Sequence, residues 1–284
     1  CATLLALALE YTQQLDEARQ VGARAIQLAL DAHAGNTQNA EVIEAREIHA
    51  RILGELGLLP QAIAEIEQAV AATRAHFGQD AIEVGFFQHA MIKFLLEAGG
   101  VERARRLAEE DIAIFTKHRE PGTYFEPVSR MTRANTYLAY RDGKSALADA
   151  QYALRELTAI LPADHPFVMR AKVALALALA YQGKIAEAEH QLEALPAKLD
   201  DKAARLLVSR ARATVAHMRG DHRQAAAAAR SALSDIAGPR SEVDSLQVLP
   251  VLGLALVELG EAEEARKTLT RTLAVSERVQ IEDS

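Results

Sequence analysis

Apolar side chains recur along most of this 284-residue chain at intervals of three or four residues, which is the period of an α-helix. Short turn-forming clusters separate these runs, as at 35–36 and 121–122. One run consists of Leu147, Ala150, Leu154 and Leu157. Most runs are long enough for four to five helical turns, so the pattern predicts fourteen helices in seven antiparallel pairs.

A glycine followed five residues later by an alanine marks the turn inside six of these pairs. Glycine suits a helix end because it adopts the left-handed conformation without a Cβ clash. The marks are Gly57/Ala62, Gly99/Ala104, Gly143/Ala148, Gly183/Ala188, Gly220/Ala225 and Gly260/Ala265. A seventh mark around Ala18 lacks the glycine, and neighbouring marks are 37–44 residues apart. The predicted repeats are approximately 1–34, 37–77, 79–119, 123–162, 164–199, 200–237 and 241–281.

No single helix pair can bury its apolar face alone, so neighbouring pairs must stack. We therefore expect an all-α fold, a right-handed α-solenoid superhelix of about seven antiparallel helix pairs that forms one domain over residues 1–284. The chain begins at Cys1 inside the first predicted repeat, which suggests a fragment of a longer protein.

The composition supports this fold and excludes several others. The 57 Ala and 36 Leu make up about a third of the chain, and β-branched and aromatic residues are sparse, which excludes a mainly β architecture. One cysteine excludes a disulfide framework. A net charge of −7 argues against general nucleic-acid binding, and the longest apolar run, Val173–Ala180, is too short to span a membrane. We expect a cytoplasmic location, with a periplasmic sensor domain as the alternative.

The segment 161–195 resembles a tetratricopeptide repeat of the kinesin-light-chain type. The resemblance rests on Asp164-His165-Pro166, Gln182-Gly183-Lys184 and Glu187-Ala188-Glu189, and on a period near 42 residues. It implies that Ala188 is buried where the two helices of its pair cross. Because the paired asparagines of that subfamily are replaced by Val173 and Ala174, its cargo recognition is not carried over. Similar arrays are appended to bacterial serine/threonine kinases and transcription regulators, which implies a signalling context.

The sequence gives little sign of catalytic, cofactor or metal chemistry. Gly143-Lys144-Ser145 ends like a phosphate-binding loop, but Leu138 stands where the first glycine is required. His217 and His222 flank a turn in a way that has some character of a metal site, and we favour a polar inter-helix turn instead. We expect a non-catalytic protein without a cofactor.

One charge pattern is less ordinary. The predicted first helices of repeats four to six, 123–141, 165–182 and 200–219, hold ten cations and three anions, which gives +7 inside a chain of −7. In tetratricopeptide arrays the first helices line the concave surface, so this surface is expected to attract an acidic segment. With the turn glycines as register, the residues expected to face this groove are His89, Lys93, Arg130, Arg133, Tyr137, Arg170 and Arg210. The alternative is that the arginines are ordinary solvated side chains.

These observations favour a protein-protein interaction module that binds an acidic partner segment in its concave groove, within a larger bacterial signalling protein. A ligand- or peptide-responsive sensor domain that controls an attached kinase or DNA-binding domain is the alternative. An open cluster of groove arginines would favour the first hypothesis, and a closed, partly apolar pocket would favour the second.

Overall fold

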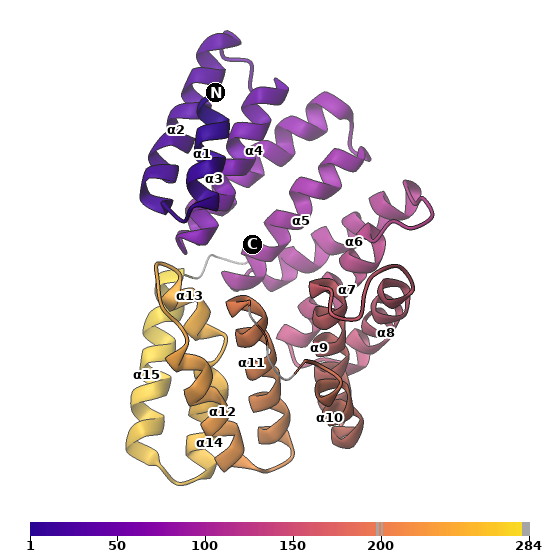
Figure 1. Ribbon diagram of the computed structural model, residues 1–284, viewed down its shortest axis with the longest axis vertical. Coiled ribbons are helices and arrows are strands. Elements are labelled where there is room, and N and C mark those ends of the chain that lie inside the picture. Colours follow the sequence, from indigo (N-terminus) through magenta and orange to yellow (C-terminus); the bar gives the residue numbers. More distant parts are fainter. Residues whose placement is uncertain (197–198, 200, 280–284) are drawn as a thin grey trace. The chain divides into compact units, whose positions relative to one another are not determined.

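The computed structural model describes residues 1–196, 199 and 201–279, and these contain α-helices and no strand (Figure 1). The chain divides into two compact units, residues 1–118 with 279 and residues 119–278. The helices of unit 1 are α1 Ala2–Tyr11, α2 Leu15–Ala32, α3 Ala40–Glu55, α4 Leu59–Phe77, α5 Ile82–Glu97 and α6 Val101–Lys117. Those of unit 2 are α7 Phe125–Ala139, α8 Gly143–Ile160, α9 Pro166–Ala180, α10 Ile185–Glu193, α11 Lys202–Met218, α12 His222–Ser234, α13 Ser241–Leu246, α14 Leu249–Glu258 and α15 Ala262–Val279.

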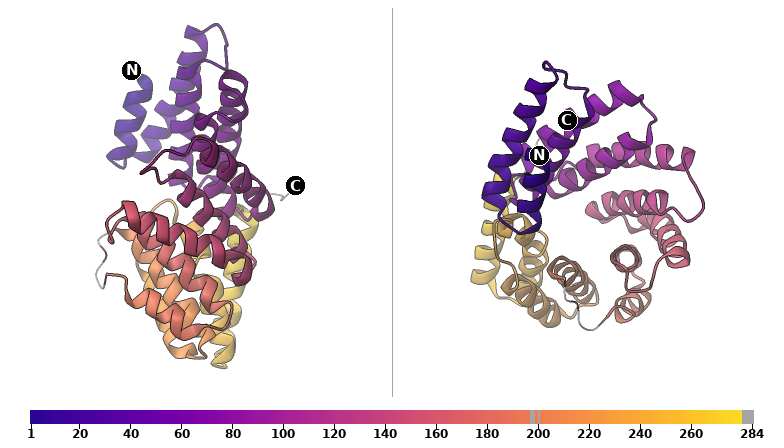
Figure 2. Two further views of the ribbon diagram at one scale, coloured as in Figure 1. Left: turned by 90° about the vertical axis from the view of Figure 1, so that its right-hand side faces the viewer. Right: turned by 45° about the horizontal axis from the view of Figure 1, so that its top comes forward.

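Within each unit the helices stack as successive pairs (Figure 2). A second helix packs against its own first helix and against the next first helix, as α8 does with α7 and α9. The first helices also contact one another directly: α1 with α3 and α3 with α5 in unit 1, and α7, α9, α11 and α14 in sequence in unit 2. We call α7, α9, α11 and α14 the inner layer of unit 2. The prediction of an all-α solenoid of helix pairs is confirmed.

Each pair turns at one residue in the left-handed conformation, with φ between 59° and 88°. The residue five positions later is always an alanine that is at most 3 % exposed. The seven pairs of turn residue and alanine are Gln13/Ala18, Gly57/Ala62, Gly99/Ala104, Arg141/Ala146, Gly183/Ala188, Gly220/Ala225 and Gly260/Ala265. Burial of Ala188 confirms the prediction for the fifth repeat. The sequence also predicts that a leucine at Ala197, near the end of that helix, destabilises the protein much less than one at Ala188, but Ala197 lies outside the described residues.

The predicted mark at Gly143/Ala148 is wrong by two residues. Arg141 holds the left-handed turn with a φ of 59°, and Asp142 caps α8 by accepting a bond from the Ser145 amide at 3.0 Å. Gly143 is already helical, and a Cβ there would overlap the Ala178 carbonyl oxygen of α9. This glycine therefore permits a close helix contact, whereas the turn itself uses an arginine in a conformation that glycine adopts more easily.

The corrected register predicts that the same substitution has a large effect on stability at one position and a small effect two residues later. Ala146 is fully buried and Ala148 is exposed on the same helix. We expect Ala146→Leu to overpack the helix crossing and lower the free energy of unfolding by about 1–3 kcal/mol. Ala148→Leu should change it by less than about 0.5 kcal/mol. Urea denaturation followed by circular dichroism measures both, and an equal loss in the two variants would contradict the register.

The last pair departs from the expected fourteen helices because its first helix is broken. The described residues form fifteen helices, since α13 ends at Leu246 and α14 begins at Leu249. Pro250 lies in the first turn of α14, where its missing N–H costs no intrahelical bond. In the part of the chain that the structure describes, no helix has the length and apolar character needed to cross a membrane.

Candidate partner-binding site

The two predicted arginines of α7 are bound to carboxylates of their own unit. Arg133 contacts Asp149 of α8 at two points, with Nε 2.7 Å from Oδ2 and Nη2 2.9 Å from Oδ1. Arg130 donates from Nε to Glu126 Oε1 at 2.6 Å, and its Nη1 lies 3.6 Å from Asp149. The side chains of Glu126 and Asp149 are only 3 % and 6 % exposed. The positive charge of both arginines is therefore neutralised inside unit 2, which argues against a direct role in binding a partner.

An aromatic ring completes this cluster. The Arg130 guanidinium lies 4.3 Å from the centre of the Tyr152 ring, within the range of a cation–π contact. Tyr152 donates its hydroxyl to Glu126 at 2.8 Å, and Arg119 donates to the same hydroxyl at 3.0 Å. Burial and the bond to Glu126 raise the pKa of Tyr152, so its hydroxyl stays a donor. We call Glu126, Arg130, Arg133, Asp149 and Tyr152 the α7–α8 charge cluster.

The shift of the turn from Gly143 to Arg141 explains why these arginines miss the expected surface. Arg130 and Arg133 precede the true turn residue by eleven and eight positions. The same positions before Gly57 hold Arg46 and His49, which face a carboxylate of their own pair: Glu65 lies 2.5 Å from Arg46 and 3.6 Å from His49. Positions eleven and eight before the turn thus face the second helix of the same pair in both repeats.

Unlike Arg130 and Arg133, the predicted residues Arg170 and Arg210 are not bound to a carboxylate of a described residue. Arg170 is exposed on α9, and no described residue pairs with it. Arg210 of α11 is half-buried, yet its Nε–H is sealed from water and finds no acceptor among the described residues. Burial lowers the pKa of the Arg210 guanidinium, and only Tyr181, at the end of α9, acts in the opposite direction. Of the predicted residues on the inner layer of unit 2, these two keep a positive charge that no described residue neutralises.

Tyr137 of α7 is half-buried against the apolar core of unit 2. It precedes the true turn residue Arg141 by four positions, as Leu53 precedes Gly57 and Leu179 precedes Gly183. Both leucines are buried, so this position mainly serves packing within the array.

His89 and Lys93 lie on α5 in unit 1. His89 Nδ1 is 3.6 Å from Oδ2 of Asp111, a fully buried carboxyl group whose oxygens accept no hydrogen bond from a described residue. Burial raises the pKa of Asp111 to about 6, with the nearby His89 acting in the opposite direction. Lys93 is exposed, with Nζ 6.0 Å from the Phe94 ring centre. That these two residues extend one groove with Arg170 and Arg210 stays a prediction.

No protein-family model and no curated protein matches this sequence. Solved structures do match it. A putative kinesin light chain of Podosopora anserina with TPR-like repeats is 21% identical, has a TM-score of 0.58, and matches over 68% of this chain and 90% of its own. The apo form of RapI is 14% identical, with a TM-score of 0.70 over 95% and 98%. The Rap conjugation gene regulator of plasmid pLS20, solved with the Phr* peptide, is 12% identical, with a TM-score of 0.64 over 96% and 72%.

The chain has the fold of a tetratricopeptide repeat array. At these identities the likeness establishes the fold alone. It agrees with the regular turn residues and buried alanines of all seven pairs.

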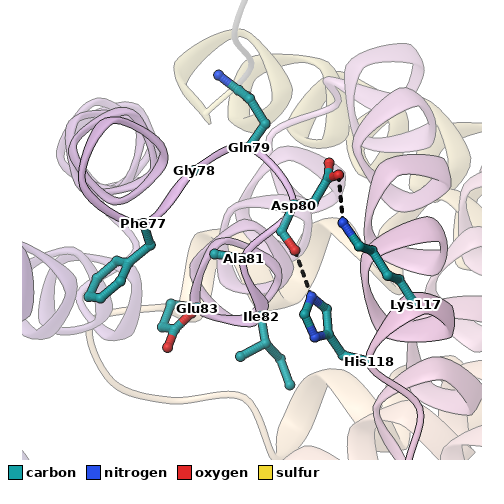
Figure 3. Close-up of a pocket in the computed structure, with 9 residues that line it drawn as sticks. All are labelled: Phe77, Gly78, Gln79, Asp80, Ala81, Ile82, Glu83, Lys117 and His118. Atoms are coloured by element: carbon teal, nitrogen blue, oxygen red, sulfur yellow. Dashed lines mark hydrogen bonds and ion pairs between the residues drawn. The ribbon is translucent and has the colours of Figure 1, made fainter.

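The array has an open depression of about 600 Å³ in unit 1, between the α4–α5 turn and the end of α6 (Figure 3). Lys117 Nζ lies 3.0 Å from the Asp80 carboxylate, and His118 Nε2 donates to the Asp80 carbonyl oxygen at 2.8 Å (Figure 3). Phe77 lies on its rim and is exposed. These contacts tie the α4–α5 turn to the end of α6.

The histidine turn of the array is a polar contact between helices. His217 Nδ1 and His222 Nδ1 are 3.2 Å apart, so one ring donates and the other accepts. Burial and the neighbouring His222 lower the pKa of His217, which favours this neutral pair. Among the described residues no three His, Cys, Asp or Glu side chains lie close enough to hold a metal ion.

Proposed function

We propose that this array is a non-catalytic interaction module whose inner layer in unit 2 binds a partner protein segment that carries carboxylate groups. Arg210 is the anchor in this proposal, and Arg170 adds positive charge on the neighbouring helix. Arg130 and Arg133 are left out because the α7–α8 charge cluster neutralises them.

The observation that carries the proposal is the unpaired guanidinium of Arg210. A buried polar group without a hydrogen-bond partner is costly, and a buried charge costs more. No carboxylate of the described protein offsets this cost, since Arg210 has no ion pair there. The rest of this half-buried guanidinium is open to a partner, whose carboxylate would pair with its charge through charge-assisted hydrogen bonds, which are the strong ones.

Two further observations support a peptide-like partner. α9 and α11 pack directly against each other, so Arg170 and Arg210 belong to neighbouring helices of one layer. The Rap regulator of pLS20, which shares the fold, was solved in complex with a peptide. An attached kinase or DNA-binding domain, and with it the sensor hypothesis, stays a prediction.

The test is an affinity selection from a random peptide library with free carboxyl ends, followed by titration of the best peptide. We expect the enriched peptides to be acidic or to require their terminal carboxylate. Arg210→Met should weaken their binding at least about tenfold, or 1.4 kcal/mol. It should not lower the melting temperature, because the half-buried guanidinium has no ion pair with a described residue that the substitution would break. Binding should also weaken with added salt.

The matched control is Arg155→Met, which removes an arginine whose side chain is 65 % exposed on the second helix α8. It should bind the peptide as the wild type does. Enrichment of peptides without acidic groups, or equal binding by all three proteins, would reject the proposal.

A further inference from the structure

Two histidines face each other across the turn that joins α11 to α12. His217 is the last residue but one of α11, and His222 is the first residue of α12. Their Nδ1 atoms are 3.2 Å apart, and their ring centres are 5.0 Å apart with an angle of 59° between the planes. We call this contact the α11–α12 histidine joint.

The hydrogen bond in this joint limits how many protons the two rings can carry. A bond between two ring nitrogens needs one N–H group and one lone pair, so the two Nδ1 atoms share a single proton. One further proton can bind at Nε2 of the donor ring, and the bond is then kept. A second further proton must take the lone pair that accepts the bond, and it leaves two positively charged rings in contact. The joint therefore tolerates one added proton and is broken by two.

Charged groups of the neighbouring elements also act on the joint. Glu258 at the end of α14 favours a proton on His217, whereas Arg141 of the α7–α8 turn opposes it. The other charged groups near the turn are two cations, Arg219 and Arg223, and two carboxylates, Asp221 in the turn and Glu189 on α10. Arg219 pairs with both carboxylates. The surroundings therefore supply no excess of negative charge that would hold two protonated rings together.

The direction of the pH dependence follows from His217. Its pKa lies below the ordinary value of 6.5, first because burial penalises the charged ring and then because His222 lies beside it. The folded protein therefore binds this proton less tightly than the unfolded chain does. The contribution of the neutral pair to stability is complete above about pH 6.5 and is lost as the pH falls below that value.

The apolar contacts that hold α12 in place are small. Its buried side chains are Ala225, Ala226, Ala229 and Ala232. Those of the second helix α4 include Leu59, Ile63, Ile66 and Val70. The free energy of burial grows with apolar area, so an alanine contributes less than a leucine or an isoleucine. Local opening is easiest where few apolar contacts have to be broken, so the loss of a polar contact at the first residue of α12 is expected to matter there.

We propose that the α11–α12 histidine joint is a pH-sensitive contact that is closed while its two Nδ1 atoms share one proton and opens when both rings are charged. Acidification then releases the start of α12 from α11. The α9–α10 turn, which consists of Gln182, Gly183 and Lys184, contains no histidine and stays closed. This inference does not depend on the partner-binding proposal.

The experiment is hydrogen–deuterium exchange followed by mass spectrometry on the 284-residue chain at pH 7.5 and pH 5.0, with each rate divided by the intrinsic rate at that pH. The reporting amides are those of Asp221 and Ala225, which donate to Ala216 and Asp221. We expect their protection to fall at least about tenfold at pH 5.0, the effect of one pKa unit. The equivalent amides of the α9–α10 turn, those of Lys184 and Ala188, should keep their protection.

His222→Gln should remove this difference between the two pH values, because glutamine is polar and takes up no proton. His217→Gln carries the same expectation, so the test does not rest on one variant, and melting curves at pH 7.5 check that both fold. His190→Gln is the matched control, since His190 is exposed on α10, and it should behave as the wild type does. Unchanged protection of the wild-type joint at pH 5.0, the same pH dependence in the glutamine variants, or an equal loss of protection in both turns would overturn the proposal.

Discussion

Replacing Asp149 by alanine is expected to lower the free energy of unfolding by about 2–4 kcal/mol. Asp149 is the buried carboxylate that holds Arg133 at two points and faces Arg130. Without it, Arg133 loses the carboxylate that it contacts at two points, and Arg130 keeps its bond to Glu126. Breaking a buried pair costs about 3–5 kcal/mol, and the partial exposure of both arginines reduces that loss. Urea denaturation followed by circular dichroism measures it.

Two comparisons separate this effect from a general loss of charge. Glu263→Ala removes the carboxylate of an exposed pair with Arg266, and it should change stability by less than about 0.5 kcal/mol. The double variant Arg133→Met/Asp149→Leu gives repeat four the residues that repeat three has at these positions, Met91 and Leu107. It should regain most of the loss, because paired apolar groups can replace a buried ion pair. A double variant as unstable as Asp149→Ala would contradict this account.

Asp111→Asn is expected to stabilise the protein at pH 7 by about 2–3 kcal/mol and to leave it unchanged near pH 4. The pKa of Asp111 is raised from 3.8 to about 6, first because burial penalises its ionised form. The native state thus holds this proton more tightly than the unfolded chain does. The stabilising contribution of the carboxyl group is complete below about pH 4 and is lost as the pH rises through 6. Asparagine has no proton to lose, so this fall disappears.

The measurement is the urea midpoint of wild type and variant at several pH values between 4 and 7. The groups that face Asp111 are His89 on α5, Glu110 on α6 and Arg74 on α4, and they are the same in both proteins. Asp80→Asn is the control, since Asp80 is 68% exposed beside Lys117. A constant difference between wild type and Asp111→Asn over this pH range would show that the carboxyl group titrates normally.

The helix pairs could be predicted from the sequence because helical periodicity and turn glycines are local signals. Five of the six turn glycines adopt the expected left-handed conformation. The exception is Gly143, where the sequence motif fits but the turn falls on Arg141. Unlike a glycine, an arginine does not indicate a left-handed turn in the sequence. Position 141 lies 42 residues after Gly99 and 42 residues before Gly183, so the spacing of the neighbouring turns indicates Arg141 as the turn residue.

The candidate site was less predictable because net charge along a helix does not show which charges are paired. The first helices do carry more arginines than acidic residues. However, Arg133 is bound to Asp149, which lies sixteen residues later on another helix, so its charge is neutralised. The buried Asp111 lies in the charged run 109–111, which from sequence alone is typical of a solvated face. Which charged side chains form ion pairs depends on which faces of two helices are in contact. Predicting those faces requires the exact position of the turn between the helices.

The packing of each helix against its neighbours in sequence also bears on how the chain acquires its structure. In both units the principal contacts join helices that are adjacent or next but one along the chain. Such contacts close short loops, so little chain entropy is lost before each one forms. A pair of helices formed anywhere within a unit can then serve as a template for the pairs on either side. A nascent chain emerging from the ribosome would therefore gain native contacts pair by pair, well before its last repeat is synthesised.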